Sequence, residues 1–450
     1  MRVTREVAII AAVHAAACVL VLALGFDHVS DDDFARVTIA QSFAHTPKLD
    51  PSGTSWLPFP FWALGSAMMA AGRSLAVARA ASIGLASLAA ALPYLAMRWR
   101  GSSRLASLLA VAFATLSPWS LWLGASTVPE SFTASFTAAA VIALGAARPP
   151  LSEANAMRLA VRVRVGFALA LLAACLSRYE PWPVAAVLAL VLAKRAVASS
   201  GRKQRGNELL LAGIVAVGPL AWLAWNAHAH GDAFHFFQRV ARFKRALGEG
   251  TQDSIPALLL YPRLLLARRP DVVVAMTCAV VTGSLFSSAG EELRRRWTVP
   301  LACAAAQLVF LAYGNVRDGA PAHHPERALL GIVFVAAAFA ADVLADTVVS
   351  AAQAARPAAL GIATFISLSW VVNGTALLED VPGTGTSELR TTQIAAGRAL
   401  ERENVEHVVV TPCAFEHFAL VAAFGSPERV TTNPRTNAEV TASCPVVERR

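Results

Sequence analysis

Residues 6–33 of this chain read EVAIIAAVHAAACVLVLALGFDHVSDDD. The apolar run at residues 6–25 is long enough to span a bilayer, so the aspartates that close the stretch, Asp31, Asp32 and Asp33, lie just outside the hydrocarbon. Like charges this close repel one another, and at least one carboxyl group should have a raised pKa, so that it could accept a proton or bind a cation near neutral pH. A solvated loop or a helix cap explains the triplet equally well at this point.

Composition indicates the class of protein. Hydrophobic residues make up 56% of the 450 residues, charged residues only 15%, and the mean hydropathy is +0.52. A soluble protein of this length would not show these values, so we expect an all-α polytopic membrane protein. No small-residue cleavage site follows the first apolar run, which we interpret as a retained helix. The net charge of +9 comes mostly from clusters between apolar runs, where it sets orientation and does not point to nucleic acid.

The basic clusters predict the topology, because loops rich in Lys and Arg stay cytoplasmic. If both 57–72 and 79–97 crossed the membrane, the cluster at 98–104 would fall outside the cytoplasm. Segment 57–72 is the shorter one, with prolines and tryptophans at its start, so we place it in the first external loop as a re-entrant or interfacial helix. The clusters lie at residues 2–5, 98–104, 148–164, 194–205 and 294–296.

This choice predicts about eleven transmembrane helices and an external tail. Segments 166–178 and 181–193 are short, and we expect them to extend further or to form a Pro-broken pair, because a charged turn at membrane depth needs cover from protein. The predicted spans are 6–25, 79–97, 105–123, 131–147, 166–178, 181–193, 209–226, 271–288, 297–313, 328–346 and 357–377.

We predict two domains. Residues 1–377 form the membrane domain, in which 27–78 is the first external loop, and residues 378–450 form a small extracytoplasmic α/β unit. In the tail, the pattern predicts helices at 387–404 and 414–424 and strands at 405–411 and 429–432. Cys413 and Cys444 could form a disulfide there in an oxidising compartment, or remain two unpaired small residues.

Polar residues gather on the predicted external side. They come from the first loop, from 126–130, from 178–180, from the long loop 227–270 and from 315–327. Charged side chains near the membrane are costly, so this gathering indicates a shared polar cavity.

The order of these motifs resembles the GT-C glycosyltransferases. The acidic pair of the first loop is followed by Trp-Leu-Pro-Phe-Pro-Phe-Trp at 56–62, by Pro129-Glu130 in the second loop and by Arg327 near a late helix start. Within that class the chain is most similar to the branch with protein O-mannosyltransferases and the lipid A aminoarabinose transferase. The resemblance covers about residues 1–377 and implies a GT-C-like fold in a bacterial-type inner membrane, with the active site on the extracytoplasmic side.

The resemblance also implies an activity. Such enzymes move a sugar from a polyprenyl-phosphate carrier to an external acceptor, usually with inversion, and the acceptor here could be protein, glycan or lipid. An inverting displacement needs a base that deprotonates the acceptor hydroxyl. The family's acidic pair aligns best with Asp32 and Asp33, and we expect Asp32 to be the base, although Asp31 leaves the register open.

The remaining site residues follow from the leaving phosphate. Cationic donors should stabilise it, and the candidates are Arg327, His323, His324 and Arg178. The alternatives are that Arg178 pairs with Glu180, that Arg327 pairs with Glu326, and that the histidines line an exposed loop. Glu130 and Glu180 are candidates for an acceptor-side or second acid, although Glu130 also suits a helix N-terminus.

The loop 227–270 carries basic residues at helical spacing beside phenylalanines, which predicts an interfacial amphipathic helix. It could hold a lipid phosphate or lie on anionic headgroups. We predict no metal and no cofactor, a divalent cation being the alternative for the aspartate cluster. Phosphate-loop, zinc-protease and nucleophile-elbow motifs are missing from the sequence, which disfavours nucleotide-sugar chemistry.

Two other functions stay open at the level of sequence. A transporter or lipid flippase would also have charged cavity residues, but the spans here are almost free of charge, with Asp342 and Asp346 as the exceptions. A scaffold that binds a partner through its tail would tolerate alanine in the aspartate triplet.

Overall fold

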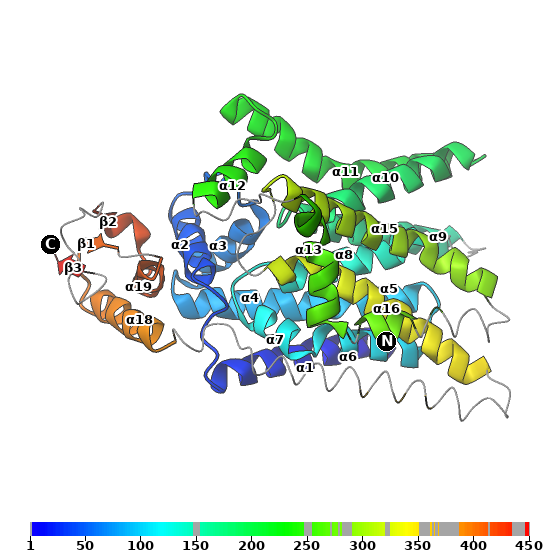
Figure 1. Cartoon of the computed structure of the whole chain (residues 1–450), viewed down its shortest axis with the longest axis horizontal. Helices are drawn as coiled ribbons and strands as arrows, with labels where there is room; N and C mark the ends of the chain where they lie inside the picture. Colours follow the sequence, from blue (N-terminus) through cyan, green and yellow to red (C-terminus); the bar gives the residue numbers. More distant parts are fainter. Residues whose placement is uncertain are drawn as a thin grey trace.

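The computed structural model describes residues 2–146, 154–246, 254–270, 272–277, 280, 290–319, 325–350, 361, 364, 368, 387–412, 415–433 and 446–449. Within these residues the chain is a helical bundle with a small α/β part at one end (Figure 1). The helices of the bundle are α1 (Arg2–Ala23), α2 (Asp32–His45), α3 (Phe59–Ala71), α4 (Leu75–Ala90), α5 (Leu92–Trp99), α6 (Arg104–Thr115), α7 (Pro118–Ala125), α8 (Glu130–Gly145), α9 (Ala154–Cys175), α10 (Pro181–Ala198), α11 (Arg202–His230), α12 (His235–Ala246), α13 (Ser254–Arg268), α15 (Gly290–Val316) and α16 (Leu330–Ser350), preceded by the 3-10 turn η1 (Pro325–Leu329).

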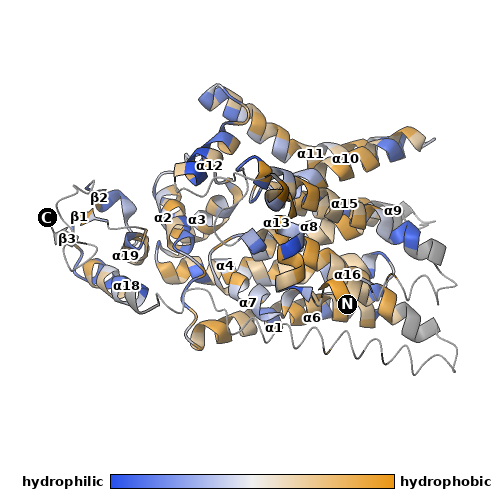
Figure 2. Cartoon of the chain, viewed as in Figure 1, coloured by the Kyte–Doolittle hydropathy of each residue, from blue (hydrophilic) through white to orange (hydrophobic). Residues whose placement is uncertain are grey.

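Two helices form the centre of the bundle. Every residue of α8 is buried, and so is the described part of α16 up to residue 345. Both helices are rich in alanine, which lets neighbouring backbones approach closely. The surrounding helices are apolar along most of their length, and hydrophilic residues concentrate on α12 and near the ends of the bundle (Figure 2). The chain is therefore a multi-pass membrane protein with an all-helical membrane part.

Six described helices are long and apolar enough to cross a membrane, or seven if the bent pair α6 and α7 counts as one span. The pair bends by 68° at Ser117-Pro118, because proline cannot continue the hydrogen bonding of α6. Helices α9 and α10 both extend beyond the short segments predicted for them. The predicted spans at 271–288 and 357–377 lie largely outside the described residues, so the count of eleven stays a prediction.

Contacts at one end of the bundle bring the basic clusters together. The Arg100 guanidinium lies 4.2 Å from the ring centroid of Trp297, next to the cluster 294–296. Arg195 donates a hydrogen bond to the carbonyl of Leu144, at the end of α8. We call this end of the bundle the basic end. The opposite end holds α2, α3 and α12, and we call it the α2 end. Helix α3 packs on α2, with Leu64 and Met68 in the same apolar cluster as Phe34.

The C-terminal part adjoins the α2 end. It contains α18 (Ser387–Arg402), β1 (Val408–Thr411), α19 (His417–Phe424), the turn η2 (Pro427–Arg429), β2 (Val430–Thr432) and β3 (Val446–Arg449). The strand order is β2-β1-β3, with β2 parallel and β3 antiparallel to β1, and the sequence pattern did not predict β3. Cys413, Cys444 and the predicted domain boundary at 377/378 lie outside the described residues.

The C-terminal part covers one face of α2. Ile394 of α18 and Ala419, Ala422 and Ala423 of α19 share an apolar cluster with residues of α2, α3 and α4. Gln41 of α2 is fully buried, and its amide nitrogen donates to the carbonyls of Arg73 and Ala422, at 2.8 Å each. Helix α2 is thus held between the bundle and the C-terminal part.

Candidate functional site

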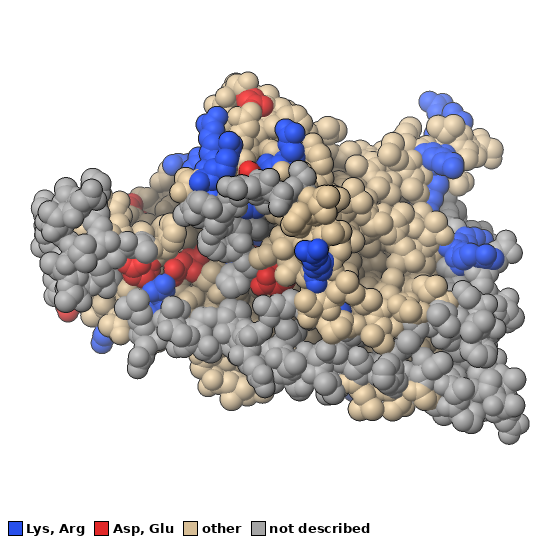
Figure 3. Space-filling model, in the orientation of Figure 1, with Lys and Arg blue, Asp and Glu red and all other residues tan. Residues whose placement is uncertain are grey.

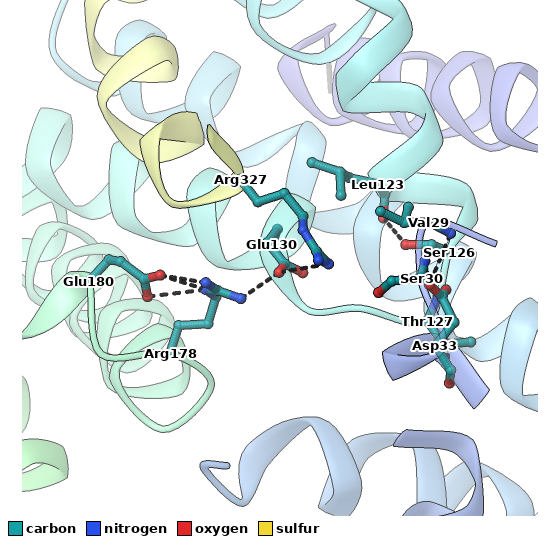
Figure 4. A network of polar contacts seen from close by, with 10 residues as sticks. All are labelled: Val29, Ser30, Asp33, Leu123, Ser126, Thr127, Glu130, Arg178, Glu180 and Arg327. Atoms are coloured by element: carbon teal, nitrogen blue, oxygen red, sulfur yellow. Dashed lines mark hydrogen bonds and ion pairs between the residues drawn. The ribbon is translucent and has the colours of Figure 1, made fainter. Parts of the chain in front are cut away.

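A buried ionic cluster forms where α8, α10 and η1 begin. Glu130 is the first residue of α8, Arg178 and Glu180 lie in the turn before α10, and Arg327 lies in η1 (Figure 4). Arg178 donates hydrogen bonds to both carboxylates, and Nη1 of Arg327 is 3.7 Å from Oε1 of Glu130. Residues predicted separately from three loops therefore meet at one point.

The charges around Glu130 decide its protonation. Burial would raise the pKa of this carboxyl, but the guanidinium groups of Arg178, Arg327 and Arg36 outweigh that effect and hold the pKa below its usual range. Glu130 is therefore an anion at neutral pH. Because its charge is already neutralised by cations, it is better suited to hold guanidinium groups than to accept a proton.

Arg36 is a third buried cation beside this cluster, and the sequence analysis did not select it. Its residue is 6% exposed, and its guanidinium lies over the Trp56 ring at 4.4 Å from the centroid. Two of its nitrogens, Nε and Nη1, are buried without a hydrogen-bond partner. Arginine stays charged even when buried, so Arg36 presents a cation with unused donors.

The aspartate triplet divides into three different environments. Asp33 is buried: Oδ2 accepts from the backbone N–H of Val29 and Ser30, and Oδ1 accepts from that of Thr127 at 2.9 Å. Burial raises the pKa of Asp33, and these backbone donors oppose the rise. Because the loop 126–129 leads directly into Glu130, Asp33 ties the start of α2 to the start of α8 (Figure 4).

Asp31 and Asp32 differ from Asp33 and from each other. Asp31 forms a two-pronged ion pair with Arg390 of α18, with N···O distances of 2.7 and 2.8 Å. Asp32 is half-buried, and its side chain makes no hydrogen bond or ion pair within the part of the chain that the structure describes. It lies four residues before Arg36, hence on the same face of α2, and its charge acts on that guanidinium.

A small cavity of about 20 Å³ adjoins the ionic cluster. Glu130, Arg178, Glu180 and Arg327 form its charged wall, and α8, α15 and α16 supply the rest. The polar side chains on that side are Thr133, Thr137 and Gln307. Charged residues from three of the five predicted loops thus line one space, while its lining includes no described residue of the first external loop or of the loop 227–270.

Other predicted site residues are not placed. His323 and His324 lie outside the described residues, so their role as phosphate ligands stays a prediction. Among the described residues, no group of three or more His, Cys, Asp or Glu side chains could hold a metal ion. Of the predicted alternatives for Arg178, pairing with Glu180 does occur, together with the contact to Glu130.

Sequence reasoning missed Arg36, Thr127 and Arg390. Arg36 had a detectable signal: it follows Asp32 at helical spacing and is surrounded by Phe34, Ala35 and Val37, which indicates a cation on a buried face. Thr127 and Arg390 had no such signal, because their partners are 94 and 359 residues away in the chain.

The sequence matches no described protein family and no curated protein. Solved structures do resemble it. ArnT from Cupriavidus metallidurans bound to undecaprenyl phosphate superposes with a TM-score of 0.55 at 13% identity, over 95% of this chain and 90% of that one. The apo state of ArnT from the same organism gives 0.50 at 15% identity, over 94% of this chain and 75% of that one. At these identities the likeness shows a shared fold and no more.

Proposed function

We propose that this protein is an integral membrane glycosyltransferase that moves a sugar from a polyprenyl-phosphate carrier to an acceptor hydroxyl, with inversion at the sugar. The observation that carries the proposal is the set of three arginines around Glu130, one of which, Arg36, is buried with two donors that have no partner. Among the described residues, the acids that act on these arginines are the buried Glu130 and Glu180 and the half-buried Asp32. Unsatisfied donors on a buried cation are costly, so this site suits a bound anion.

The anion that fits is the phosphate of a lipid-linked sugar. Guanidinium groups bind phosphate oxygens in pairs, and they stabilise the charge that grows on a departing phosphate. The fold is shared with ArnT, one structure of which contains undecaprenyl phosphate. In this proposal Arg36, Arg327 and Arg178 hold the phosphate, and His323 and His324 remain candidates for the same role.

Asp32 is the proposed base. Asp31 is engaged with Arg390, and both oxygens of Asp33 already accept hydrogen bonds, which leaves Asp32 as the available carboxylate of the triplet. Asp32 lies one helical turn from Arg36, and in-line attack would require it to contact the acceptor hydroxyl on the side of the sugar away from the phosphate. Glu130 and Glu180 then orient the guanidinium groups and do not act on the acceptor.

The reaction balances with these groups alone. The acceptor oxygen attacks the anomeric carbon while the bond from that carbon to the phosphate oxygen breaks, and the bonding electrons leave with the phosphate. The acceptor proton passes to Asp32, and attack opposite the leaving group inverts the configuration. We place this chemistry at the extracytoplasmic face of an inner membrane, because the α2 end lies opposite the basic clusters.

A transfer assay tests the proposal. Purified protein would receive radiolabelled polyprenyl-phosphate sugars and an acceptor extract, and binding of undecaprenyl phosphate would be measured separately. We expect Asp32→Asn to lose at least about a hundredfold in turnover while it still binds the lipid phosphate, because a general base contributes on that scale. We expect Arg36→Ala to lose binding as well.

The control variant is Arg202→Ala, which removes an exposed arginine at the basic end of α11 and should keep wild-type activity. Full transfer by both Asp32→Asn and Arg36→Ala would overturn the site assignment. Movement of the intact lipid across the membrane without sugar transfer would favour a flippase.

A further inference from the structure

Helix α12 is set apart by its charge. Four of its twelve residues are Arg or Lys, namely Arg239, Arg242, Lys244 and Arg245. Lys and Arg side chains gather over this part of the surface (Figure 3). The helix begins five residues after the end of α11, a candidate membrane span, at the end of the bundle opposite the other basic clusters. Basic loops are normally kept on the other side of the membrane, so this cluster needs a separate explanation.

The two faces of α12 differ. Its inner face is anchored: Phe236 stacks on Tyr179 at 4.4 Å between ring centroids, and Lys244 donates to the side-chain oxygen of Asn315 at 3.0 Å. Its outer face exposes Arg239, Arg242 and Arg245. A stable inner face fixes the direction in which the outer cations point.

The outer cations have no acidic partner in the described chain. Arg239 donates to the carbonyl of Gly53, Arg242 to the side chain of Gln238 and Arg245 to the carbonyl of Ala241. Asp232, which lies just before α12, accepts hydrogen bonds from the side chain of Gln238 and from the backbone of Phe234. Within the described residues, the charge of these exposed guanidinium groups is not neutralised.

Large apolar side chains flank the cations. Phe234 is 58% exposed and Phe243 is 50% exposed, and α13, which follows, exposes Ile255 and Leu258. Exposed rings beside cations at the end of a membrane span are typical of a helix that lies in the headgroup region, with its rings among the acyl chains. In water the same rings would be unfavourable.

We infer that the outer face of α12 binds the headgroups of anionic phospholipids in the leaflet at the α2 end. Arg239, Arg242 and Arg245 contact lipid phosphates, and Phe234 and Phe243 enter the boundary of the acyl chains. This interaction does not depend on the proposed sugar transfer. Each basic residue near an anionic surface raises the affinity by about fivefold, so the three cations together give a strong preference for anionic lipid.

Photocrosslinking from Phe243 tests the inference on the full chain. Phe243 would be replaced by benzoyl-phenylalanine, and the protein reconstituted in vesicles with equal amounts of labelled phosphatidylglycerol and phosphatidylcholine. We expect crosslinking to phosphatidylglycerol to exceed that to phosphatidylcholine, with an excess that falls at high salt. In this background Arg239→Gln/Arg242→Gln/Arg245→Gln should lower the ratio at least about fivefold.

Two further variants keep the result interpretable. Arg242→Gln/Arg245→Gln leaves the Arg239–Gly53 bond intact and should still lower the ratio. Arg202→Gln/Lys203→Gln/Arg205→Gln removes equal charge from the basic end of α11 and should leave the ratio unchanged.

Three outcomes would overturn the inference. They are equal crosslinking of the two lipids by the wild type, an unchanged ratio in the triple α12 variant, and loss of the phosphatidylglycerol signal when a trace of undecaprenyl phosphate is added. The last result would mean that α12 selects the carrier lipid and not the bulk headgroups.

Discussion

At the residue scale, the cluster around Glu130 combines two opposing effects. Burial works against any charge there, and the guanidinium groups of Arg178, Arg327 and Arg36 make the charge favourable again. Such an arrangement stabilises the fold only while every partner keeps its charge. In the proposed mechanism it would also hold the arginines in place before the phosphate binds, which is the preorganisation that transfer chemistry requires.

This balance predicts how stability depends on pH. Because the pKa of Glu130 is lower in the folded protein than its usual 4.5, its contribution is present above about pH 4.5 and is lost as the pH falls through the lowered value. Near neutral pH, Glu130→Gln should therefore lower the free energy of unfolding by about 3–5 kcal/mol, because it removes the carboxylate that faces the arginines. The variant should unfold at a lower temperature than the wild type. The difference should shrink in acid.

Thermal unfolding in detergent from pH 7 down to about pH 3 measures this difference, across the range in which carboxyl groups titrate. The matched control is Asp232→Asn, which changes an acid that bonds to Gln238 at the surface and should follow the wild type. A constant gap between Glu130→Gln and wild type at all pH values would contradict the prediction.

At the element scale, α2 carries the proposed base and Arg36 on one face and rests on the C-terminal part with the other. The ion pair Asp31–Arg390 and the hydrogen bonds of Gln41 cross that contact, and Gly397 lets α18 approach α19 closely, because a Cβ there would meet the backbone of Leu420. The C-terminal part is thus a support for the site as well as an appendage of the bundle.

Arg390→Gln tests the importance of this support. Asp31 would lose its partner in a partly buried position, so we expect the protein to lose about 1–3 kcal/mol of stability. In the double variant Asp31→Asn/Arg390→Gln no charge is left unpaired, and the loss should be smaller than the sum of the two single variants. Unfolding of full-length protein, followed by intrinsic fluorescence, would measure each value.

The control is Arg398→Gln, which removes an exposed arginine of the same helix and should change stability by less than about 0.5 kcal/mol. Additive effects of Asp31→Asn and Arg390→Gln would show that the two residues act independently, against the geometry of the pair.

Elements that depend on local sequence patterns were predicted well, and elements that depend on distant contacts were not. Hydrophobic length and basic clusters act locally, so α1, α10, α11 and α15 were predicted close to their observed positions. The bend between α6 and α7 was missed, although Pro118 marks it, because the apolar pattern continues through it. Strand β3 was missed because its pairing with β1 depends on residues far away in sequence.

The site shows the same division. That Glu130, Arg178 and Arg327 share a cavity could be predicted, because each lies at a helix end on the same side of the alternating topology. The different environments of Asp31, Asp32 and Asp33 could not be predicted. They depend on Arg390 and Thr127, which come from distant segments and meet the triplet only after folding.

At the scale of the whole molecule, the protein separates charge along the bundle. At the basic end, Arg164 of α9 forms an ion pair with Glu208 of α11. The candidate site and α12 lie at the α2 end. If basic loops stay in the cytoplasm, the candidate site, α12 and the C-terminal part all face the opposite side. A substrate carried by a lipid in that leaflet would then meet the site without crossing the membrane.

Reporter fusions test this orientation. A phosphatase that is active only outside the cytoplasm should be inactive when fused after Arg100, in the loop between α5 and α6, and active when fused after Gly231 or at the C-terminus of the full chain. A fluorescent protein that matures only in the cytoplasm should give the reverse pattern and serves as the matched control. The pattern follows from the contact between Arg100 and Trp297, which brings two basic loops to one end. Phosphatase activity after Arg100, or fluorescence at the C-terminus, would invert the molecule and place the candidate site in the cytoplasm.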